Sequence, residues 1–528
     1  MTSSTPALRL HGWVNGPGTA VERIAFVSTV VFAGAIFWLA PRLPITDLAQ
    51  HAGQVAVWHD LLLGTSQWRP LVEVNYLTPY VTGYGLALLL SFVMPVGAAL
   101  KLMLALAFYA FVAAGAALRE RLGGDRRLDW LLIPGFFGFA YASGFYTFLV
   151  AAPIGMLFVL LAHRYAGRPT PALGVVLFLT DLVLFFSHGL VFLFANLIGG
   201  IFLLCRQRRL SRLLPALVPY AAIGLVCVVY ALLNLHLESA SSAGLPGIGW
   251  GWDLGRLYFP VFALGSPAAD PQATRLFGPL ALLMLAAPLV LGARLNRRDP
   301  TALVPLGVTL LVWSLVPAAV PATGTWFLYQ RFALFLLPFY GLVFRAPDSP
   351  RRCVLCRLWL PVLCWATLAI HVERLLAFAQ ESAAFDDVLA ATAPGHRALG
   401  VIFDPASPAA SSTTAYLHFP LWYQAEKAGF VDFNFAGFQQ QVVRYRPDRV
   451  PPVFGTPAWS WDPGQGIDWT RDRASIYRYF FVRRTAPLPK GYFPAGRCEP
   501  ILLKSAGAWS VFENLNCHTA LDARQSAP

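Results

Sequence analysis

The stretch RLPITDLAQHAGQVAVWHDLL, residues 42–62, follows directly on an apolar run and decides how the rest of the chain is interpreted. The preceding run, residues 22–41, is long enough to cross a hydrocarbon core of about 30 Å. The quoted stretch then places two aspartates and two histidines just beyond that span. Because ionisable groups are costly in hydrocarbon, this position indicates a segment that works at the membrane surface.

The composition is typical of a polytopic membrane protein. Of the 528 residues, 57% are hydrophobic and 13% are charged, and the mean hydropathy is +0.56. These values are far too apolar for a soluble globular protein. The net charge of +13 comes mostly from arginines in short links between apolar runs. That placement indicates membrane topology and contacts with lipid headgroups, and no nucleic-acid partner is expected.

Arginine-rich links set the expected topology, since short cytoplasmic loops are enriched in Lys and Arg. The links are 119–127, 163–168, 206–212, 294–298 and 345–352. Counting outward from them predicts about eleven spans, each near the length that a bilayer requires. The predicted spans are 22–41, 100–119, 128–145, 147–164, 171–187, 188–206, 213–236, 276–295, 302–321, 328–345 and 354–375.

This count has consequences for the two ends of the chain and for the first loop. Residues 1–21 are expected to be cytoplasmic, and residues 22–375 form the transmembrane domain. Residues 42–99 form one large exoplasmic loop, in which segment 80–98 is an interfacial or re-entrant helix that is too short to span. The protein is expected to be integral to a bacterial inner or plasma membrane.

The composition changes after residue 375, where charges, Pro and Gly increase. Short alternating strands are predicted at 398–404, 477–484 and 508–515, with a helix near 414–429. Residues 376–528 are therefore expected to form a soluble α/β domain on the exoplasmic (periplasmic) side. There, Cys498 and Cys517 are a candidate disulfide. The fold class is thus an α-helical polytopic membrane protein with a C-terminal exoplasmic α/β domain.

The quoted stretch is predicted to be an amphipathic helix at the membrane surface, with Asp47, His51, Gln54 and Trp58 on one stripe. An aspartate one turn before a histidine can act as a general base, orient the imidazole or share a divalent cation with it. The structural alternatives stay open. Asp47 and Gln50 fit a capping box at the start of the helix, and His51 is a candidate solvated surface group.

Further candidates for substrate binding lie elsewhere in the chain. Asp181 precedes His188 by seven residues, so the two are expected to share a helix face, or Asp181 forms a structural pair inside the bundle. Arg331, at the outer start of a span, can clamp a lipid phosphate or simply extend to the interface. In loop 237–275, Trp252 can stack on a sugar or belong to an aromatic belt, and Asp253 is a candidate carboxylate.

The order of these features resembles the GT-C membrane glycosyltransferases, which include oligosaccharyltransferases and protein O-mannosyltransferases. The resemblance lies in an acidic residue opening the first outer loop (PITDLAQH, 44–51), an interfacial Pro/Tyr segment (NYLTPYVTGYGLALLL, 75–90) and an outer C-terminal domain. It implies a polyprenyl-phosphate sugar donor, a glycan, lipid or protein acceptor, and inverting transfer on the exoplasmic face. It also implies that Asp47 is the base, that Arg331 contacts the donor phosphate, and that His51 and His188 support them.

The sequence departs from that family at the second outer loop. Residues 141–148 (YASGFYTF) contain no acidic residue, and Asp253 is the candidate substitute. No cofactor is expected, with a divalent cation as the open alternative. Two other classes of function also remain: a multi-span transporter, which would show repeated halves with broken helices, and a non-catalytic scaffold of envelope polysaccharide assembly.

Overall fold

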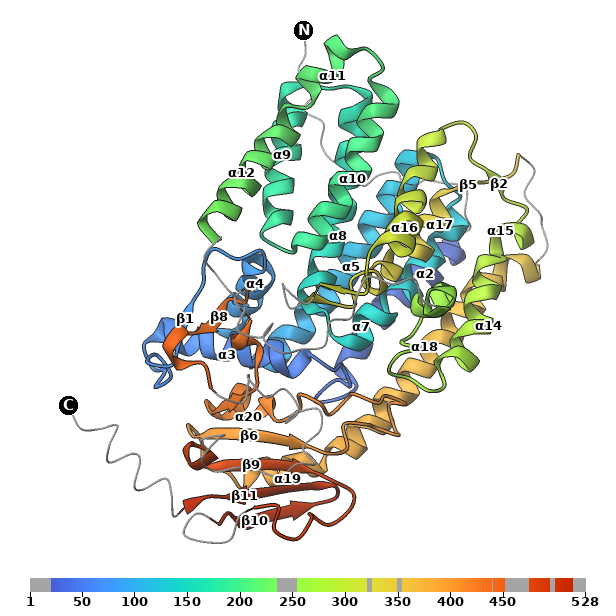
Figure 1. The fold of residues 1–528 in the computed structure, drawn as a ribbon. Helices are drawn as coiled ribbons and strands as arrows, with labels where there is room; N and C mark the ends of the chain where they lie inside the picture. Colours follow the sequence, from blue (N-terminus) through green and yellow to red (C-terminus); the bar gives the residue numbers. More distant parts are fainter. Residues whose placement is uncertain are drawn as a thin grey trace.

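The computed structural model describes residues 20–234, 254–320, 325–348, 354–438, 440–451, 474–493 and 499–515. They form a helical bundle with a mixed α/β domain at one end (Figure 1). The main bundle helices are α2 (Ala20–Ala35), α5 (Val96–Leu122), α8 (Tyr146–Gly167), α9 (Pro171–Phe185), α10 (Gly189–Arg206), α11 (Leu210–Ala216), α12 (Val218–Asn234), α14 (Ala273–Leu285), α15 (Ala287–Val290), α16 (Val304–Leu315) and α18 (Val354–Ser382).

Among the described residues, five helical segments are long and apolar enough to cross a membrane. They are Ala20–Trp38, Val96–Leu122, Tyr146–Gly167, Gly189–Arg206 and Val354–Ala390. Helices α11 and α12 make a sixth if they count as one span bent by 46°. The larger count of about eleven spans stays a prediction.

Several of the predicted spans are divided into shorter elements, and two of them most clearly. Span 128–145 divides into η2 (Arg126–Leu131), α6 (Leu132–Phe136) and α7 (Phe139–Ser143), because Gly138 is extended with ψ of −153°. Span 328–345 divides into η6 (Gln330–Phe335), α17 (Leu336–Leu342) and β5 (Phe344–Arg345). The last span also extends further than predicted, since α18 continues to Ser382.

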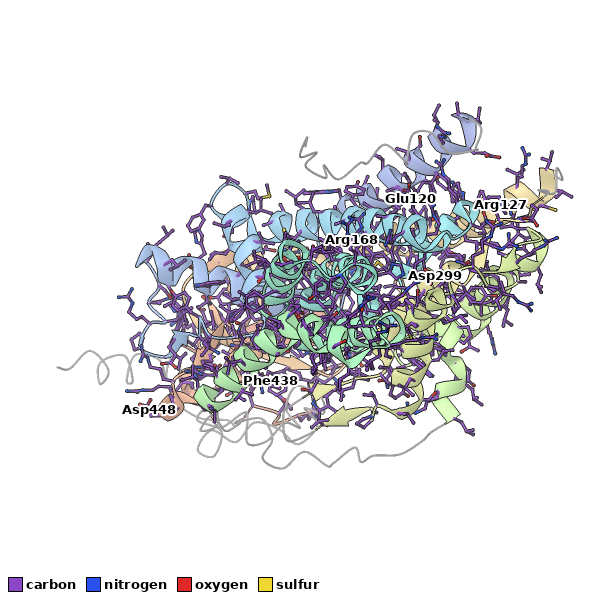
Figure 2. The ribbon with its side chains drawn as sticks, turned by 90° about the horizontal axis from the view of Figure 1, so that it is seen from above. Glu120, Arg127, Arg168, Asp299, Phe438 and Asp448 are labelled. Atoms are coloured by element: carbon purple, nitrogen blue, oxygen red, sulfur yellow. The ribbon has the colours of Figure 1, made fainter. Side chains whose placement is uncertain are left out.

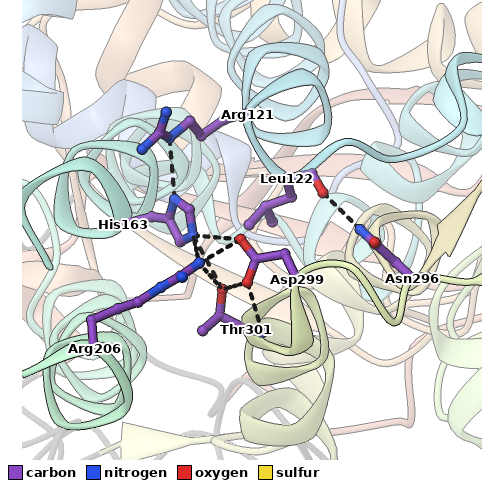
Figure 3. A network of polar contacts seen from close by, with 7 residues as sticks. All are labelled: Arg121, Leu122, His163, Arg206, Asn296, Asp299 and Thr301. Carbon is purple, nitrogen blue, oxygen red and sulfur yellow. Dashed lines mark hydrogen bonds and ion pairs between the residues drawn. The ribbon is translucent and has the colours of Figure 1, made fainter. Parts of the chain in front are cut away.

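Polar contacts join the arginine-rich links at one end of the bundle (Figure 3). Arg121 donates from Nε to His163 Nδ1 at 3.2 Å. His163 Nε2 then faces Asp299 Oδ2 at 3.2 Å, and Arg206 Nη2 pairs with the same oxygen at 2.6 Å. Both ring nitrogens of this buried histidine are therefore occupied, one by an arginine donor and one by a carboxylate, so its role is structural. Three of the links therefore meet around one carboxylate.

The remaining two links reach the same end. Asn296 donates to the Leu122 carbonyl at 2.6 Å, and β2 (Arg294–Leu295) pairs antiparallel with β5. This end is opposite the α/β domain in Figure 1, so the prediction that the five links share one side of the bundle agrees with the fold. Figure 2 views the molecule along the bundle, with Glu120, Arg127, Arg168 and Asp299 labelled.

The first outer loop contains α3 (Leu48–Leu63), β1 (Val72–Val74) and α4 (Val81–Ser91). Helix α4 is short, as predicted. The alternative in which His51 is a solvated surface group is wrong, because His51 is buried, as are Gln54 and Trp58 on the same stripe. The position of α3 at the membrane surface stays a prediction. The α/β domain covers that stripe, and α3 lies between it and the bundle (Figure 1).

The C-terminal domain contains a five-stranded mixed sheet in the order β10-β11-β9-β6-β7. Its strands are β6 (Arg397–Ile402), β7 (Phe430–Asp432), β9 (Tyr479–Arg483), β10 (Ile501–Ala506) and β11 (Trp509–Glu513). Strand β6 runs parallel to β7 and β9, while β9, β11 and β10 are antiparallel. The three predicted strands are confirmed as β6, β9 and β11. The predicted helix is shorter, as α20 (Leu421–Lys427), beside α19 (Ala384–Ala390).

Buried polar contacts dock this domain on the first outer loop. Arg42 is 7% exposed and pairs with Glu426 at 2.7 Å and Asp386 at 2.5 Å. The Gln54 amide accepts from the Val443 N–H at 2.8 Å and donates to its carbonyl at 3.0 Å. The neighbouring strand β8 (Val443–Tyr445) also pairs with β1. The loop and the domain therefore form one continuous hydrogen-bonded unit.

Candidate functional site

Asp47 lies directly before α3, between the bundle and the C-terminal domain. Its backbone φ of −95° and ψ of 1° are outside the usual cap geometry, and within the described residues 42–63 its side chain makes no capping hydrogen bond. The predicted capping box is therefore wrong. Gln50 does not reach back either, because its Oε1 accepts from the Phe435 N–H at 2.9 Å. The Asp47 carboxylate is thus left for other partners.

The second outer loop packs directly behind Asp47. The Asp47 N–H donates to the Ser143 carbonyl at 3.3 Å. Gly144 follows with φ of +84°, and a Cβ there would lie 2.7 Å from the Asp47 nitrogen. Only glycine accepts that conformation and that approach without strain. The loop that lacks an acidic residue therefore contributes backbone to the site.

Burial makes Asp47 an unusual carboxylate. Its side chain is 19% exposed, and burial raises its pKa from 3.8 to about 7, against an opposing effect of the Arg331 guanidinium. A carboxylate with a pKa near 7 is matched to proton transfer at neutral pH. Strongly perturbed groups of this kind are concentrated at functional sites.

Arg331 supplies positive charge to the same region. The guanidinium lies over the Phe145 ring, 3.7 Å from its centroid, and Nη2 donates to the Trp326 carbonyl at 2.7 Å. Its Nε is buried without a hydrogen-bond partner, and no carboxylate among the described residues lies within 4 Å of the group. A buried cation that lacks a close counter-ion favours binding of an anion.

His51 is buried behind the carboxylate, 5% exposed. Its Nδ1 lies 2.6 Å from the Tyr84 hydroxyl, and its Nε2 lies 2.9 Å from the Gly144 carbonyl. Burial lowers its pKa to about 3, so the ring is neutral at pH 7 and Nε2–H donates to that carbonyl. Both ring nitrogens are occupied, and His51 therefore anchors the Gly144 loop beside Asp47.

His188 is the N-cap of α10, and its Nδ1 accepts from the Leu190 N–H at 3.2 Å. Its ring packs against Tyr80 and Phe148, both at 5.3 Å between centroids. Because Nδ1 is an acceptor, the ring hydrogen is on Nε2 in the neutral form. Electrostatic interaction with Arg331 places His188 in the same group of side chains.

Asp181 is held away from this group. It is buried, and its Oδ1 accepts from Asn196 Nδ2 at 2.7 Å, between α9 and α10. The prediction that Asp181 shares a helix face with His188 is wrong, because α9 ends at Phe185 and His188 begins the next helix. Trp252 and Asp253 lie outside the described residues, as do Cys498 and Cys517.

The C-terminal domain contributes a residue that no sequence pattern singled out. His418 Nε2 faces Asp47 Oδ1 at 3.5 Å, and its Nδ1 lies 3.1 Å from Gln50 Nε2. His418 is 8% exposed, and burial lowers its pKa to about 4. Gln50 and His418 are 368 residues apart in the chain, and no local motif connects them. Only the docking of the two domains brings them together.

The group thus contains one carboxylate, one cation and neutral imidazoles. In the described part of the chain, no group of three or more His, Cys, Asp or Glu side chains is arranged to hold a metal ion. The arrangement can accept a proton at Asp47 and bind negative charge at Arg331.

Comparison with known proteins finds a similarity of fold and no match in sequence. No family model matches the chain, and no curated protein matches it. The fold is similar to the arabinofuranosyltransferase AftD from Mycobacteria, determined by cryo-EM, with 15% identity and a TM-score of 0.49. The similarity covers 94% of this chain but only 40% of that one. At this identity and TM-score it does not by itself assign an activity.

Proposed function

We propose that the protein is a membrane glycosyltransferase. It transfers a sugar from a polyprenyl-phosphate donor to a glycan, lipid or protein acceptor of the cell envelope, on the exoplasmic face. The observation that carries this proposal is the partly buried Asp47 carboxylate, with a pKa raised to about 7, which interacts electrostatically with a cation that has no close carboxylate partner among the described residues.

The two groups suit the two halves of an inverting displacement. The acceptor hydroxyl oxygen forms a bond to the anomeric carbon while the bond from that carbon to the donor phosphate oxygen breaks. Asp47 accepts the hydroxyl proton, and such base assistance is worth roughly 10²- to 10⁴-fold in rate. The departing lipid phosphate carries negative charge, which Arg331 meets with its guanidinium.

The neighbouring groups complete the site in this proposal. His188 Nε2–H is a further donor for the phosphate, because its Nδ1 is already occupied by the Leu190 N–H. His51 holds the Gly144 carbonyl and thereby the loop behind Asp47. The role of Asp47 does not require a metal ion, since the lipid phosphate is already a good leaving group and the acceptor hydroxyl is the weak nucleophile that needs a base.

The test compares two matched Asp→Asn substitutions in cells whose envelope glycan depends on this protein. Asp47→Asn keeps the size of the side chain and removes the base, while Asp181→Asn removes a buried carboxylate outside the site. We expect loss of an envelope sugar in Asp47→Asn, retention in Asp181→Asn, and normal abundance of both proteins. Full glycan in Asp47→Asn would rule out Asp47 as the base and favour a scaffold.

A binding measurement separates the proposal from a transporter. We expect purified wild type and Asp47→Asn to bind a polyprenyl-phosphate sugar equally, and Arg331→Gln to bind it more weakly, since Arg331, unlike Asp47, contacts the phosphate in this proposal. Uptake of a free sugar into vesicles without any lipid-linked product would contradict the proposal.

A further inference from the structure

The contact between Asp47 and His418 joins the membrane domain to the C-terminal domain inside the site. His418 follows β6 and precedes α20, and Asp47 precedes α3. The Thr46 and Thr414 hydroxyls lie 2.8 Å apart beside this contact. Contacts from both domains therefore hold the Asp47 and His418 side chains in place.

The hydrogen bonds around Gln50 determine which nitrogen of His418 carries the hydrogen. The Phe435 N–H is a donor, so the Gln50 atom that it contacts at 2.9 Å is the amide oxygen. The other end of that amide is then the NH₂ group, which donates to His418 Nδ1 at 3.1 Å. A neutral imidazole that accepts at Nδ1 carries its hydrogen on Nε2.

That nitrogen lies on the side of the ring that faces the carboxylate. His418 Nε2 lies 3.5 Å from Asp47 Oδ1, a longer contact than an ordinary hydrogen bond. Because the imidazole is buried, it stays neutral near pH 7 and presents a polar N–H to the carboxylate without a competing positive charge. A hydrogen bond to the charged form of an acid favours that form.

We propose that His418 is a positioning residue for Asp47: the C-terminal domain inserts an Nε2–H donor that orients the carboxylate and favours its ionised form, with Gln50 fixing the tautomer. This role rests on the proposed function of Asp47 as the base. In the reaction His418 keeps its hydrogen and Asp47 takes the proton of the acceptor. Docking of the C-terminal domain therefore completes the membrane-domain site.

Other groups also face the carboxylate and have to be held constant in a test. They are Arg331 from η6 and Tyr84 from α4, which both interact with it electrostatically. His51 faces Tyr84 and Gly144 with its two nitrogens, so it offers Asp47 no hydrogen. Among the described groups, His418 is thus the neutral imidazole whose Nε2 lies within 4 Å of the Asp47 carboxylate.

The experiment titrates Asp47 directly in the full-length protein in detergent micelles. The protonated carboxyl is followed by its infrared C=O stretch, as the difference between each protein and the same protein carrying Asp47→Asn. The matched variants are His418→Gln, whose amide nitrogen reaches the position of Nε2, and His418→Asn, whose shorter amide reaches only Nδ1. His418→Leu removes both contacts and serves as the second test if one amide variant does not fold.

We expect His418→Asn and His418→Leu to raise the midpoint of Asp47 by about one pH unit, the lower end for a hydrogen bond to a charged group because the contact is long. His418→Gln is expected to stay near the wild type. An unchanged midpoint in His418→Asn and His418→Leu, or an equal rise in all three variants, would overturn the proposal.

The titration also separates this inference from the proposed function. If the midpoints move as expected while Asp47→Asn cells keep their full envelope glycan, His418 positions Asp47 but Asp47 is not the base. If Asp47→Asn loses the sugar and the midpoints stay unchanged, the proposed glycosyltransferase function is supported and His418 has only a structural role. If Asp47→Asn loses the sugar and the midpoints also move as expected, the acid limb of the pH–rate profile for sugar transfer in His418→Asn moves to higher pH by the same amount.

Discussion

Ionised Asp47 is expected to destabilise the folded protein, and this loss of stability can be measured without a substrate. The pKa of Asp47 is raised from 3.8 to about 7 by burial. One pKa unit corresponds to about 1.36 kcal/mol, so the shift corresponds to a cost of about 4 kcal/mol for the ionised group. Asp47→Asn removes that cost and keeps a similar shape.

The sign of the pH dependence follows from linkage. Between pH 3.8 and about 7, the unfolded chain has released the Asp47 proton while the folded protein still holds it. The wild type therefore loses stability relative to Asp47→Asn as the pH rises through this window, and the difference becomes constant above it. All other titrating groups are common to both proteins and largely cancel in the difference.

The assay is paired thermal unfolding of both proteins in detergent micelles, from about pH 4 to about pH 9, at one scan rate. We expect the Tm of Asp47→Asn to exceed that of the wild type by an increasing margin up to about pH 7. Asp448→Asn, on a side chain that is 71% exposed, is the control and should show no such trend. A difference between Asp47→Asn and wild type that does not change with pH would refute the reasoning.

Three further predictions concern contacts at the site and at the interface with the C-terminal domain. Arg331→Gln should raise the midpoint of the Asp47 infrared titration and lower envelope glycan transfer by about 10²- to 10³-fold, because both anions lose their cation; a fall of less than tenfold in the glycan assay would argue against a phosphate contact. Gly144→Ala should abolish transfer and lower the Tm, since the new Cβ would lie 2.7 Å from the Asp47 nitrogen at a φ of +84°; normal activity would show that the loop adapts. Gln54→Leu should leave the Val443 N–H and carbonyl unpaired, at about 1–3 kcal/mol each, and make the C-terminal domain more sensitive to limited proteolysis; unchanged cleavage would mean that the other docking contacts suffice.

Local patterns in the sequence were sufficient for the features that depend on neighbouring residues. Apolar runs predicted the helices of the bundle, because a helix in hydrocarbon satisfies its own backbone. Alternating residues predicted β6, β9 and β11, because successive side chains of a strand face opposite sides. The arginine links predicted which helix ends lie on one side of the bundle, and His163 and Arg206 from two of these links meet at Asp299 there.

The same local reasoning failed where distant segments compete for a side chain. Asp47 and Gln50 fit a capping box, yet Gln50 is bonded to Phe435 and His418 from the C-terminal domain. His51 was a candidate solvated group because its helix is amphipathic in sequence, but both of its ring nitrogens are bonded, to Tyr84 and Gly144. A pattern of period 3.6 identifies a polar face and cannot say whether water or another domain covers it.

Local sequence patterns therefore predicted several apolar helices followed by an α/β domain, and made Asp47 a candidate catalytic carboxylate. The partners of that carboxylate follow from the tertiary contacts. The pKa of Asp47 depends on burial between two domains and on Arg331, and its nearest imidazole is His418 rather than the neighbouring His51. Burial and electrostatic interaction depend on distances in space, which the order of residues along the chain does not specify.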